Sequence, residues 1–109
     1  MNYRIVMYEN ARGDKPVRQY ITKLDHSTQA KYLRLINILS KCGPSLGMPY
    51  SKRLTKHLRE IRITGKTSVR VIYTNIKGIY ILLHVFTKKT RKTPKKEIQT
   101  AESRRLTLT

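Results

Sequence analysis

The sequence predicts a small α+β domain in which helices cover one face of an antiparallel, twisted sheet. Three observations support this fold class: two segments with helical spacing occupy residues 16–41, three β-type runs follow one another in residues 58–86, and a helix start follows near residue 94. With one further β-type run at the beginning, the element order is β-α-α-β-β-β-α. No repeat or linker interrupts the 109 residues, so we expect a single domain over residues 1–109.

The first strand is expected over Tyr3–Tyr8, before a break at residues 9–14. Pro16 suits the first turn of a helix, and the apolar residues of that helix recur at helical spacing: Val17, Tyr20, Ile21 and Leu24. A second helix is expected from near Ser27 to about Lys41, where Gly43-Pro44 is a strong stop signal. Residues 43–50 read as a loop, and residues 51–57 as a connector to the central strands.

Three adjacent antiparallel strands are predicted at Leu58–Ile63, Ser68–Tyr73 and Ile79–Phe86. Residues 64–67 and 75–78 carry the glycines of two hairpin connections. Because side chains alternate along a strand, one face of the last strand is purely apolar and is predicted to pack on the two helices: Ile79, Ile81, Leu83 and Val85. The opposite, open face is predicted to hold His84, Phe86 and Lys88.

The C-terminal helix is predicted to begin at Thr93-Pro94, near the end of a basic block at residues 87–96. Thr93 is expected to cap it, Pro94 to occupy its first position and Glu97 its first turn. Its buried stripe is expected to contain Ile98, Ala101 and Leu106.

Positive charge is the unusual feature of the composition. The chain has 24 Lys and Arg against 6 Asp and Glu, a net charge of +18, and residues 1–30 hold only +2 of it. A compact domain with this much charge repels itself, so we expect the excess to serve a polyanionic partner, with nucleic acid the first candidate. A solubilising surface is the simpler explanation for a small excess, but it does not account for the uneven distribution.

Cysteine and apolar content indicate a cytoplasmic protein. Cys42 is the only cysteine, which excludes an intramolecular disulfide and a cysteine-based metal site. No apolar run approaches the roughly 20 residues that span a bilayer, and no signal peptide is apparent, so no membrane association is expected. The three histidines lack metal-ligand spacing and carboxylates are few, so neither a metal nor a cofactor is predicted.

Basic side chains on the open face form the candidate site. Arg62 and Arg70 on neighbouring strands and Lys88 at the end of a third are predicted to converge on one phosphate. An arginine fork contacts two phosphate oxygens and stabilises charge that develops in a transition state. Such a set could bind an RNA backbone, or cleave it without a metal, since the 2′-OH of RNA can attack the adjacent phosphate.

Several residues could carry the proton, and each also has a structural explanation. A crowded lysine, at 88 or 89, loses its proton more readily than usual. His57, His84 and Tyr73 are alternatives, although a histidine late in an apolar strand is more often packed than catalytic. Glu60 is either a base or the ion-pair partner of its arginine neighbours. Phe86 either stacks on a base or belongs to the core.

The strands and their basic tail resemble the RelE/HigB superfamily of toxins from toxin–antitoxin systems, specifically its phage-derived HigB-like branch. The resemblance is strongest over residues 46–106, and its most specific part is Phe86-x-Lys88-Lys89-Thr90 followed by Thr93-Pro94. The remaining matching segments are Leu54, Leu58–Arg62, Val69–Tyr73, Leu82–Val85 and Glu97-Ile98.

This resemblance implies a compact RelE-like RNase fold and ribosome-dependent cleavage of mRNA that leaves a 2′,3′-cyclic phosphate and stops translation. It also implies a cognate antitoxin, often a helix-turn-helix HigA-like protein, through which alone the toxin would contact operator DNA. Carried over by position, Arg62, Arg70 and Lys88 form the phosphate site, with His57 as a further catalytic residue. Predicted RNA-binding residues are Lys52, Arg53, Phe86, Lys89, Arg91 and Lys92. The alternative is a non-catalytic basic module of the same fold that only binds RNA or DNA.

Overall fold

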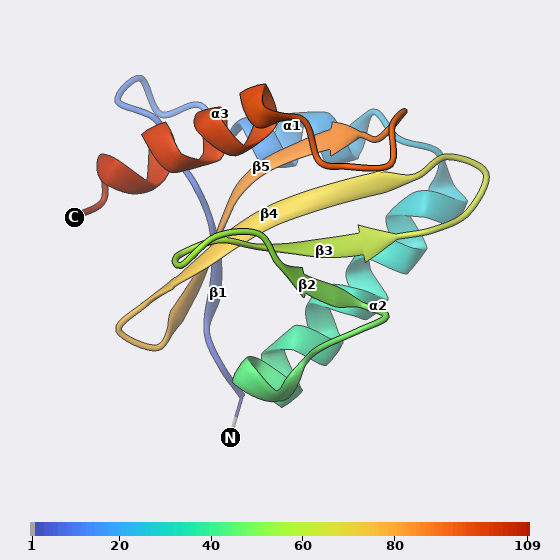
Figure 1. The fold of residues 1–109 in the computed structure, drawn as a ribbon, viewed down its shortest axis with the longest axis horizontal. Helices are drawn as coiled ribbons and strands as arrows, with labels where there is room; N and C mark the ends of the chain where they lie inside the picture. The colour runs from blue at the N-terminus through green and yellow to red at the C-terminus, as the bar shows by residue number, and fades with distance from the viewer. Residues whose placement is uncertain (1) are drawn as a thin grey trace.

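A computed structural model describes residues 2–109 as a five-stranded mixed sheet between helices (Figure 1). Helices α1 and α2 lie on one side of the sheet and α3 lies on the other. The elements in chain order are β1 (Ile5–Met7), α1 (Pro16–Thr22), α2 (His26–Cys42), the short 3₁₀ helix η1 (Gly43–Ser45), β2 (Ser51–Arg53), β3 (Arg59–Ile63), β4 (Val69–Ile76), β5 (Ile79–Thr87) and α3 (Lys95–Leu106). The predicted α+β fold and its element order are confirmed, with one strand added.

The strand order in the sheet is β1-β5-β4-β3-β2. The three central strands are antiparallel neighbours, as predicted. Two features differ from the prediction. β1 pairs with β5 in parallel, which makes the sheet mixed, and residues expected to form a connector form the edge strand β2. β2 has only polar residues, so it lacks the apolar alternation that marks a strand, and its pairing with β3 holds it in place.

A bulge in β5 changes which side chains reach each face of the sheet. Tyr73 pairs with Leu82 and Ile72 with His84, so Leu83 is an extra residue in β5. The alternation shifts at this point: Leu82 and Val85 pack in the core with α1 and α2. The predicted apolar face of β5 is therefore confirmed at Val85 and wrong at Ile81 and Leu83, which pack with α3 instead.

The protein has two hydrophobic cores, one on each side of the sheet. The larger core is formed by α1, α2 and the facing strands: Val17, Ile21, Tyr32, Leu35, Leu39, Leu46, Ile61, Ile63, Val69, Val71, Tyr73, Tyr80, Leu82 and Val85. The smaller core lies between the sheet and α3: Tyr8, Leu58, Ile72, Leu83, Phe86 and Ala101. The face predicted to be open is thus covered by α3 above β4 and β5, and only its β2–β3 side stays accessible.

The start of α3 differs from the predicted capping pattern. The helix begins at Lys95 with Pro94 as its N-cap residue, and no side chain caps it. The Thr93 hydroxyl instead donates a hydrogen bond to Glu60 Oε1, at 2.6 Å. The segment that leads into α3 is therefore tied to β3 in the centre of the sheet.

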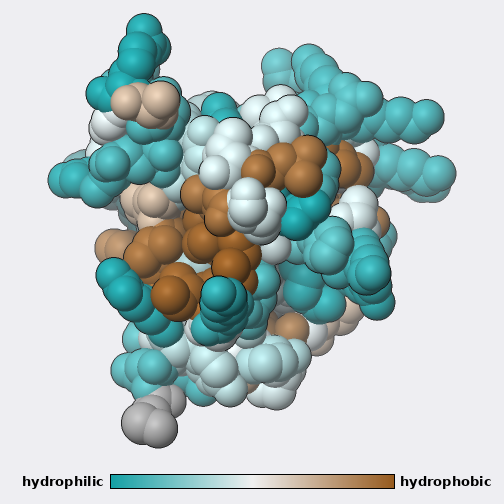
Figure 2. Space-filling model, turned by 90° about the vertical axis from the view of Figure 1, so that its left-hand side faces the viewer, coloured by the Kyte–Doolittle hydropathy of each residue, from teal (hydrophilic) through white to brown (hydrophobic). Residues whose placement is uncertain are grey.

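An apolar area lies on the left-hand side of the molecule as Figure 1 is viewed. Figure 2 shows the side that carries the C-terminus and the β4–β5 turn, where a continuous apolar area is bordered by hydrophilic side chains. None of the helices within residues 2–109 has the length and apolar composition needed to cross a membrane.

Candidate nucleic-acid interface

A cavity of about 250 Å³ lies on the part of the sheet that α3 leaves uncovered. It is termed the Lys88 cavity here. Its walls come from β2, β3, the residues after β5 and the first turn of α3: Lys52, Arg53, Leu54, Glu60, Arg62, Lys88, Arg91, Lys92, Thr93 and Ile98. Six of these ten side chains carry positive charge, so the cavity is suited to an anion.

Strand pairing brings the predicted arginines together. Arg62 of β3 is directly opposite Arg70 of β4 in the antiparallel register. The Lys88 N–H donates to the Ser68 carbonyl at 2.7 Å, which continues the pairing beyond the end of β5. Two of the residues predicted to meet at one phosphate therefore lie opposite each other on neighbouring strands, and Lys88 directly follows the next strand, β5.

Glu60 holds Arg70 in place beneath the cavity. Their side chains are 2% and 5% exposed, and Arg70 Nε lies 3.7 Å from Glu60 Oε2. Burial lowers the pKa of Arg70 from its ordinary value, and the charge of Glu60 opposes this effect. Arginine stays protonated at ordinary pH even so. With Thr93 bound to its other oxygen, Glu60 is the ion-pair partner rather than a free base.

Two buried donors have no hydrogen-bond acceptor within residues 2–109: Arg62 Nε and Arg70 Nε. Buried polar groups in proteins are normally hydrogen-bonded, so each exception needs an explanation. The ion pair with Glu60 compensates part of the charge of Arg70. Because both Nε atoms are shielded from solvent, an anion could reach them only if the surrounding side chains moved.

The Lys88 amine has a lowered affinity for its proton. Desolvation, then the positive charge of Arg70, lowers the pKa of Lys88 from its ordinary value, with smaller contributions from Arg62 and Lys52 and opposition from Glu60. A lysine in this position exchanges a proton more readily than a solvated one.

The structure brings most of the other predicted RNA-binding residues to the same place. Lys52, Arg53, Arg91 and Lys92 line the Lys88 cavity, and Lys89 is exposed but outside its lining. Phe86 differs, because its side chain is 5% exposed and packs in the core under α3. Its ring is not available to stack on a nucleobase.

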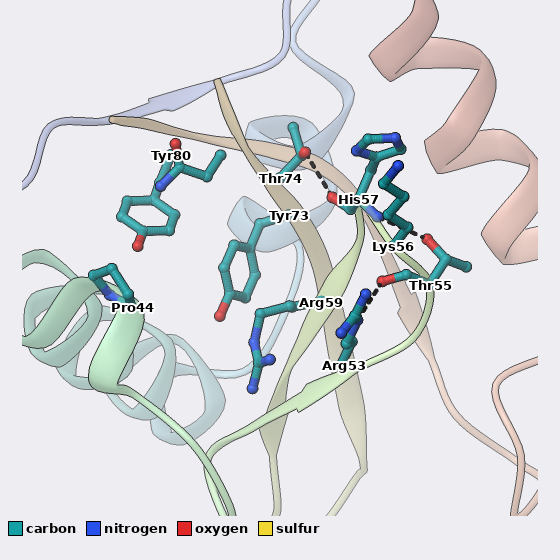
Figure 3. Close-up of a pocket in the computed structure, with 10 residues that line it drawn as sticks. Pro44, Arg53, Thr55, Lys56, His57, Arg59, Tyr73, Thr74 and Tyr80 are labelled. Carbon is teal, nitrogen blue, oxygen red and sulfur yellow. Dashed lines mark hydrogen bonds between the residues drawn. The ribbon is translucent and has the colours of Figure 1, made fainter. Parts of the chain in front are cut away.

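His57 does not join this cavity. It lines a second cavity, of about 400 Å³, together with Arg53, Arg59 and Tyr73 (Figure 3). The His57 carbonyl accepts a hydrogen bond from the Thr74 hydroxyl at 2.7 Å. The second cavity is termed the Arg59 cavity here.

His84 is a packed residue that joins β5 to α3. Its Nε2 lies 2.9 Å from Glu97 Oε1, its Nδ1 lies 3.3 Å from Arg104 Nη1, and its ring stacks on Phe86. Burial lowers the pKa of His84, while Glu97 opposes this and Arg104 adds to it. A neutral ring that donates from Nε2 and accepts at Nδ1 matches both partners.

Thr93 and Ile98 were not predicted as site residues, although both line the Lys88 cavity. Thr93 was interpreted as a helix cap and Ile98 as part of a buried stripe. No local signal in the sequence reveals the bond between Thr93 and Glu60, because 33 positions separate the two residues.

These features define a small, strongly basic α+β protein with a cationic cavity on a partly covered sheet. The chain belongs to the family described as phage derived protein Gp49-like (DUF891), whose profile matches residues 19–106. This family is associated with RelE/HigB-like toxins, which indicates a toxin of the toxin–antitoxin type with an antitoxin as its partner. A comparison with curated protein sequences found no match.

Proposed function

We propose that this protein is the toxin of a type II toxin–antitoxin pair of the HigB-like branch and an endoribonuclease that cleaves mRNA on the ribosome. The observation that carries the proposal is the position of Lys88. Its amine has a lowered pKa and lines a cationic cavity with Arg62, beside the buried Arg70. The family association supports the toxin class.

The proposed reaction uses a nucleophile from the RNA itself. The 2′-oxygen forms a bond to the adjacent phosphorus, the bond from phosphorus to the 5′-oxygen breaks, and the products are a 2′,3′-cyclic phosphate and a free 5′-OH. The 2′-OH loses one proton and the 5′-oxygen gains one, so no metal-bound water is required. Arg62 and Arg70 would stabilise the charge that grows on the non-bridging oxygens.

Lys88 is the residue of this cavity best suited to exchange a proton with the RNA. Its neutral form would accept the proton of the 2′-OH, and its charged form would donate to the 5′-oxygen. Arg62 and Arg70 cannot take the base role at ordinary pH. His57 lines the other cavity, which leaves Lys88 as the proton carrier of this proposal.

Contacts outside the reacting phosphate would come from the flanking cations. Lys52, Arg53, Lys89, Arg91 and Lys92 would bind neighbouring phosphates of mRNA and ribosomal RNA. The antitoxin would be a helix-turn-helix, HigA-like protein that also contacts the operator DNA. The apolar area in Figure 2 is the kind of surface that a protein partner covers.

The second candidate function is a non-catalytic RNA- or DNA-binding module of the same fold. Two observations favour it: Arg70 is 4% exposed, and Phe86 is covered by α3. In this case the cationic cavity would bind a backbone without cleaving it.

Induction of the chain alone, with mapping of mRNA 5′ ends, separates the two candidates. Wild type should stop growth and produce cuts in phase with codons, and Arg70→Ala should lose them. Because Arg70 is buried, Lys88→Met is the cleaner variant, and its cleavage rate should fall about 10²- to 10⁴-fold as expected for loss of a general acid or base. Lys95→Met, at the exposed start of α3, is the matched control. Growth arrest without cuts, or cuts that Lys88→Met leaves unchanged, would contradict cleavage at Lys88.

A further inference from the structure

The Arg59 cavity carries cations that, apart from Arg53, have no role in the proposed cleavage. It has a volume of about 400 Å³, and Arg53, Lys56, His57 and Arg59 contribute basic side chains to its lining. Arg59 lies beside Glu60 in β3, so the two side chains point to opposite faces of the sheet. The Arg59 cavity is therefore separate from the cavity that Glu60 lines, although both border the edge strand β2.

Two arginines of the Arg59 cavity are direct cross-strand neighbours. Arg53 of β2 is opposite Arg59 of β3 in the antiparallel register. Like charges directly opposite each other destabilise a sheet. A bound anion between or beside these side chains would remove that repulsion.

Hydrogen bonds hold both guanidinium groups by their Nε atoms. Arg59 Nε donates to the Ser51 hydroxyl at 3.0 Å, and the same hydroxyl lies 2.7 Å from the Tyr73 hydroxyl. Arg53 Nε donates to the Thr55 carbonyl at 3.1 Å. The Nη groups of both arginines make no hydrogen bond within residues 2–109 and can bind a ligand. A preorganised arginine fork loses less entropy on binding.

Arg53, Lys56 and Arg59 make no ion pair with a carboxylate within residues 2–109, although the charge of His57 contributes to the lowered pKa of Glu102. Every acidic residue of the chain has its partner elsewhere within residues 2–109: Glu9 with Lys15, Asp14 with Arg12, Asp25 with Thr28, Glu60 with Arg70, Glu97 with His84 and Glu102 with Arg105. Two arginines with fixed Nε donors and one lysine consequently give the Arg59 cavity positive charge without an ion-pair partner among the described residues.

We propose that the Arg59 cavity is a second phosphate-binding site. Arginine forks match the paired oxygens of a phosphate, and the hydroxyl of Tyr73 lies toward Arg59, whereas that of Tyr80 lies toward Pro44 (Figure 3). Tyr73 and Tyr80 are 2% and 4% exposed, so their ring faces are not available to stack on a base. The site therefore recognises a phosphate and not the base attached to it.

The backbone of single-stranded RNA is the source that the structure favours. Arg53 lines both cavities, so one strand that crosses the edge of β2 could place a phosphate in each. This choice of source rests in part on the proposed RNA substrate, whereas the phosphate site itself does not. A free nucleotide offers the same chemical group and is tested separately.

The test measures binding without cleavage or ribosomes. A 2′-O-methyl RNA of roughly ten nucleotides lacks the attacking hydroxyl, so its affinity reports only on contacts with the backbone. Arg59→Gln should weaken its binding about tenfold or more, as expected for loss of a charge-assisted phosphate contact, and should reduce the salt slope by about 0.7. Arg18→Gln, an exposed position of α1, removes the same charge and should have little effect.

A second measurement keeps the proposal testable if Arg59→Gln does not fold. Inorganic phosphate, 5′-AMP and the 2′-O-methyl RNA are titrated into wild type while the NMR signal of the Arg59 Nε–H group is followed. A saturable shift with RNA alone supports a backbone site, and one with phosphate and 5′-AMP supports a nucleotide site. Equal weakening by Arg59→Gln and Arg18→Gln, or an Arg59 signal that no probe shifts, overturns the proposal. These binding measurements do not depend on mRNA cleavage. A failure of the proposed cleavage in cells would therefore not alter their outcome.

Discussion

Glu60 is the residue that compensates the buried positive charge of Arg70. It is 1% exposed, pairs with Arg70 and accepts the hydrogen bond of Thr93. Removing one partner of a buried ion pair costs more than the pair contributes, because an uncompensated charge remains in a low-dielectric region.

Glu60→Gln should therefore lower the free energy of unfolding by roughly 3 kcal/mol or more. The shape of the side chain and an acceptor for Thr93 are retained, so the loss reports on charge. Glu9→Gln removes an equal charge from an exposed pair with Lys15 and should change stability by less than about 1 kcal/mol. Urea unfolding of the three proteins measures both values. Equal effects of the two substitutions would show that the buried pair is not a special contributor.

His84 should make stability depend on pH through its contacts with α3. The pKa of His84 is lowered from 6.5 in the folded protein, chiefly by burial. Between the lowered value and 6.5 the unfolded chain binds more protons, so the free energy of unfolding rises with pH across that window. Below the folded pKa, His84 makes no further contribution to the pH dependence.

His84→Gln, which cannot titrate, provides the measurement. The difference in unfolding free energy between wild type and His84→Gln should become smaller as the pH falls from about 7 toward 5. Other titrating groups are common to both proteins and cancel in this difference. A difference that stays constant or grows on acidification would mean that the protonated ring is accommodated beside Glu97.

Among the elements, β4 and β5 depend on a two-residue turn. Ile76 pairs with Ile79, and Lys77 and Gly78 between them have φ angles of 52° and 84°. Positive φ at both central residues is the geometry of a type I′ turn, which suits the twist of a hairpin. The Asn75 side chain supports it by accepting from the Gly78 N–H at 2.9 Å.

Gly78→Ala should destabilise the protein by about 1 kcal/mol, because an L side chain is strained at positive φ. A Cβ at position 78 would meet no atom within 4 Å, so the cost is that of the backbone alone. Gly47 has equally open surroundings without a positive φ, and Gly47→Ala should be neutral or stabilise by up to about 1 kcal/mol. Thermal unfolding of both variants tests the contrast, and a loss at position 47 as large as that at position 78 would contradict it.

For the whole molecule, the net charge of +18 favours binding to RNA and lowers the stability of the fold. The six acidic residues are already engaged in ion pairs or hydrogen bonds, so the remaining cations repel one another. Salt screens this repulsion and also competes with the protein for RNA phosphates.

Raising NaCl from roughly 50 to 500 mM should increase the melting temperature and weaken RNA binding in the same range. KCl at equal ionic strength is the control for ion-specific effects. Calorimetry and fluorescence anisotropy measure the two quantities. A melting temperature that falls with both salts would show that attractive ion pairs outweigh the repulsion.

The local elements of this protein were predictable because their signals are local. Pro16 begins α1, Gly43 ends α2, and the apolar runs of β3, β4 and β5 pair as expected. The placement of Arg62 and Arg70 on neighbouring strands, with Lys88 directly after the next strand, follows from the same alternation. Fold class, charge and the candidate phosphate residues were thus contained in the sequence.

The tertiary structure decided what depends on contacts between distant residues. The bulge at Leu83 reversed part of the expected face of β5, and α3 covered Phe86 and bound His84. Pairing with β3 turned the polar residues Ser51–Arg53 into a strand, and Thr93 became a partner of Glu60 instead of a cap. A periodic sequence pattern predicts which residues share a face of a strand or helix. Which element covers that face depends on the packing free energy of the whole chain.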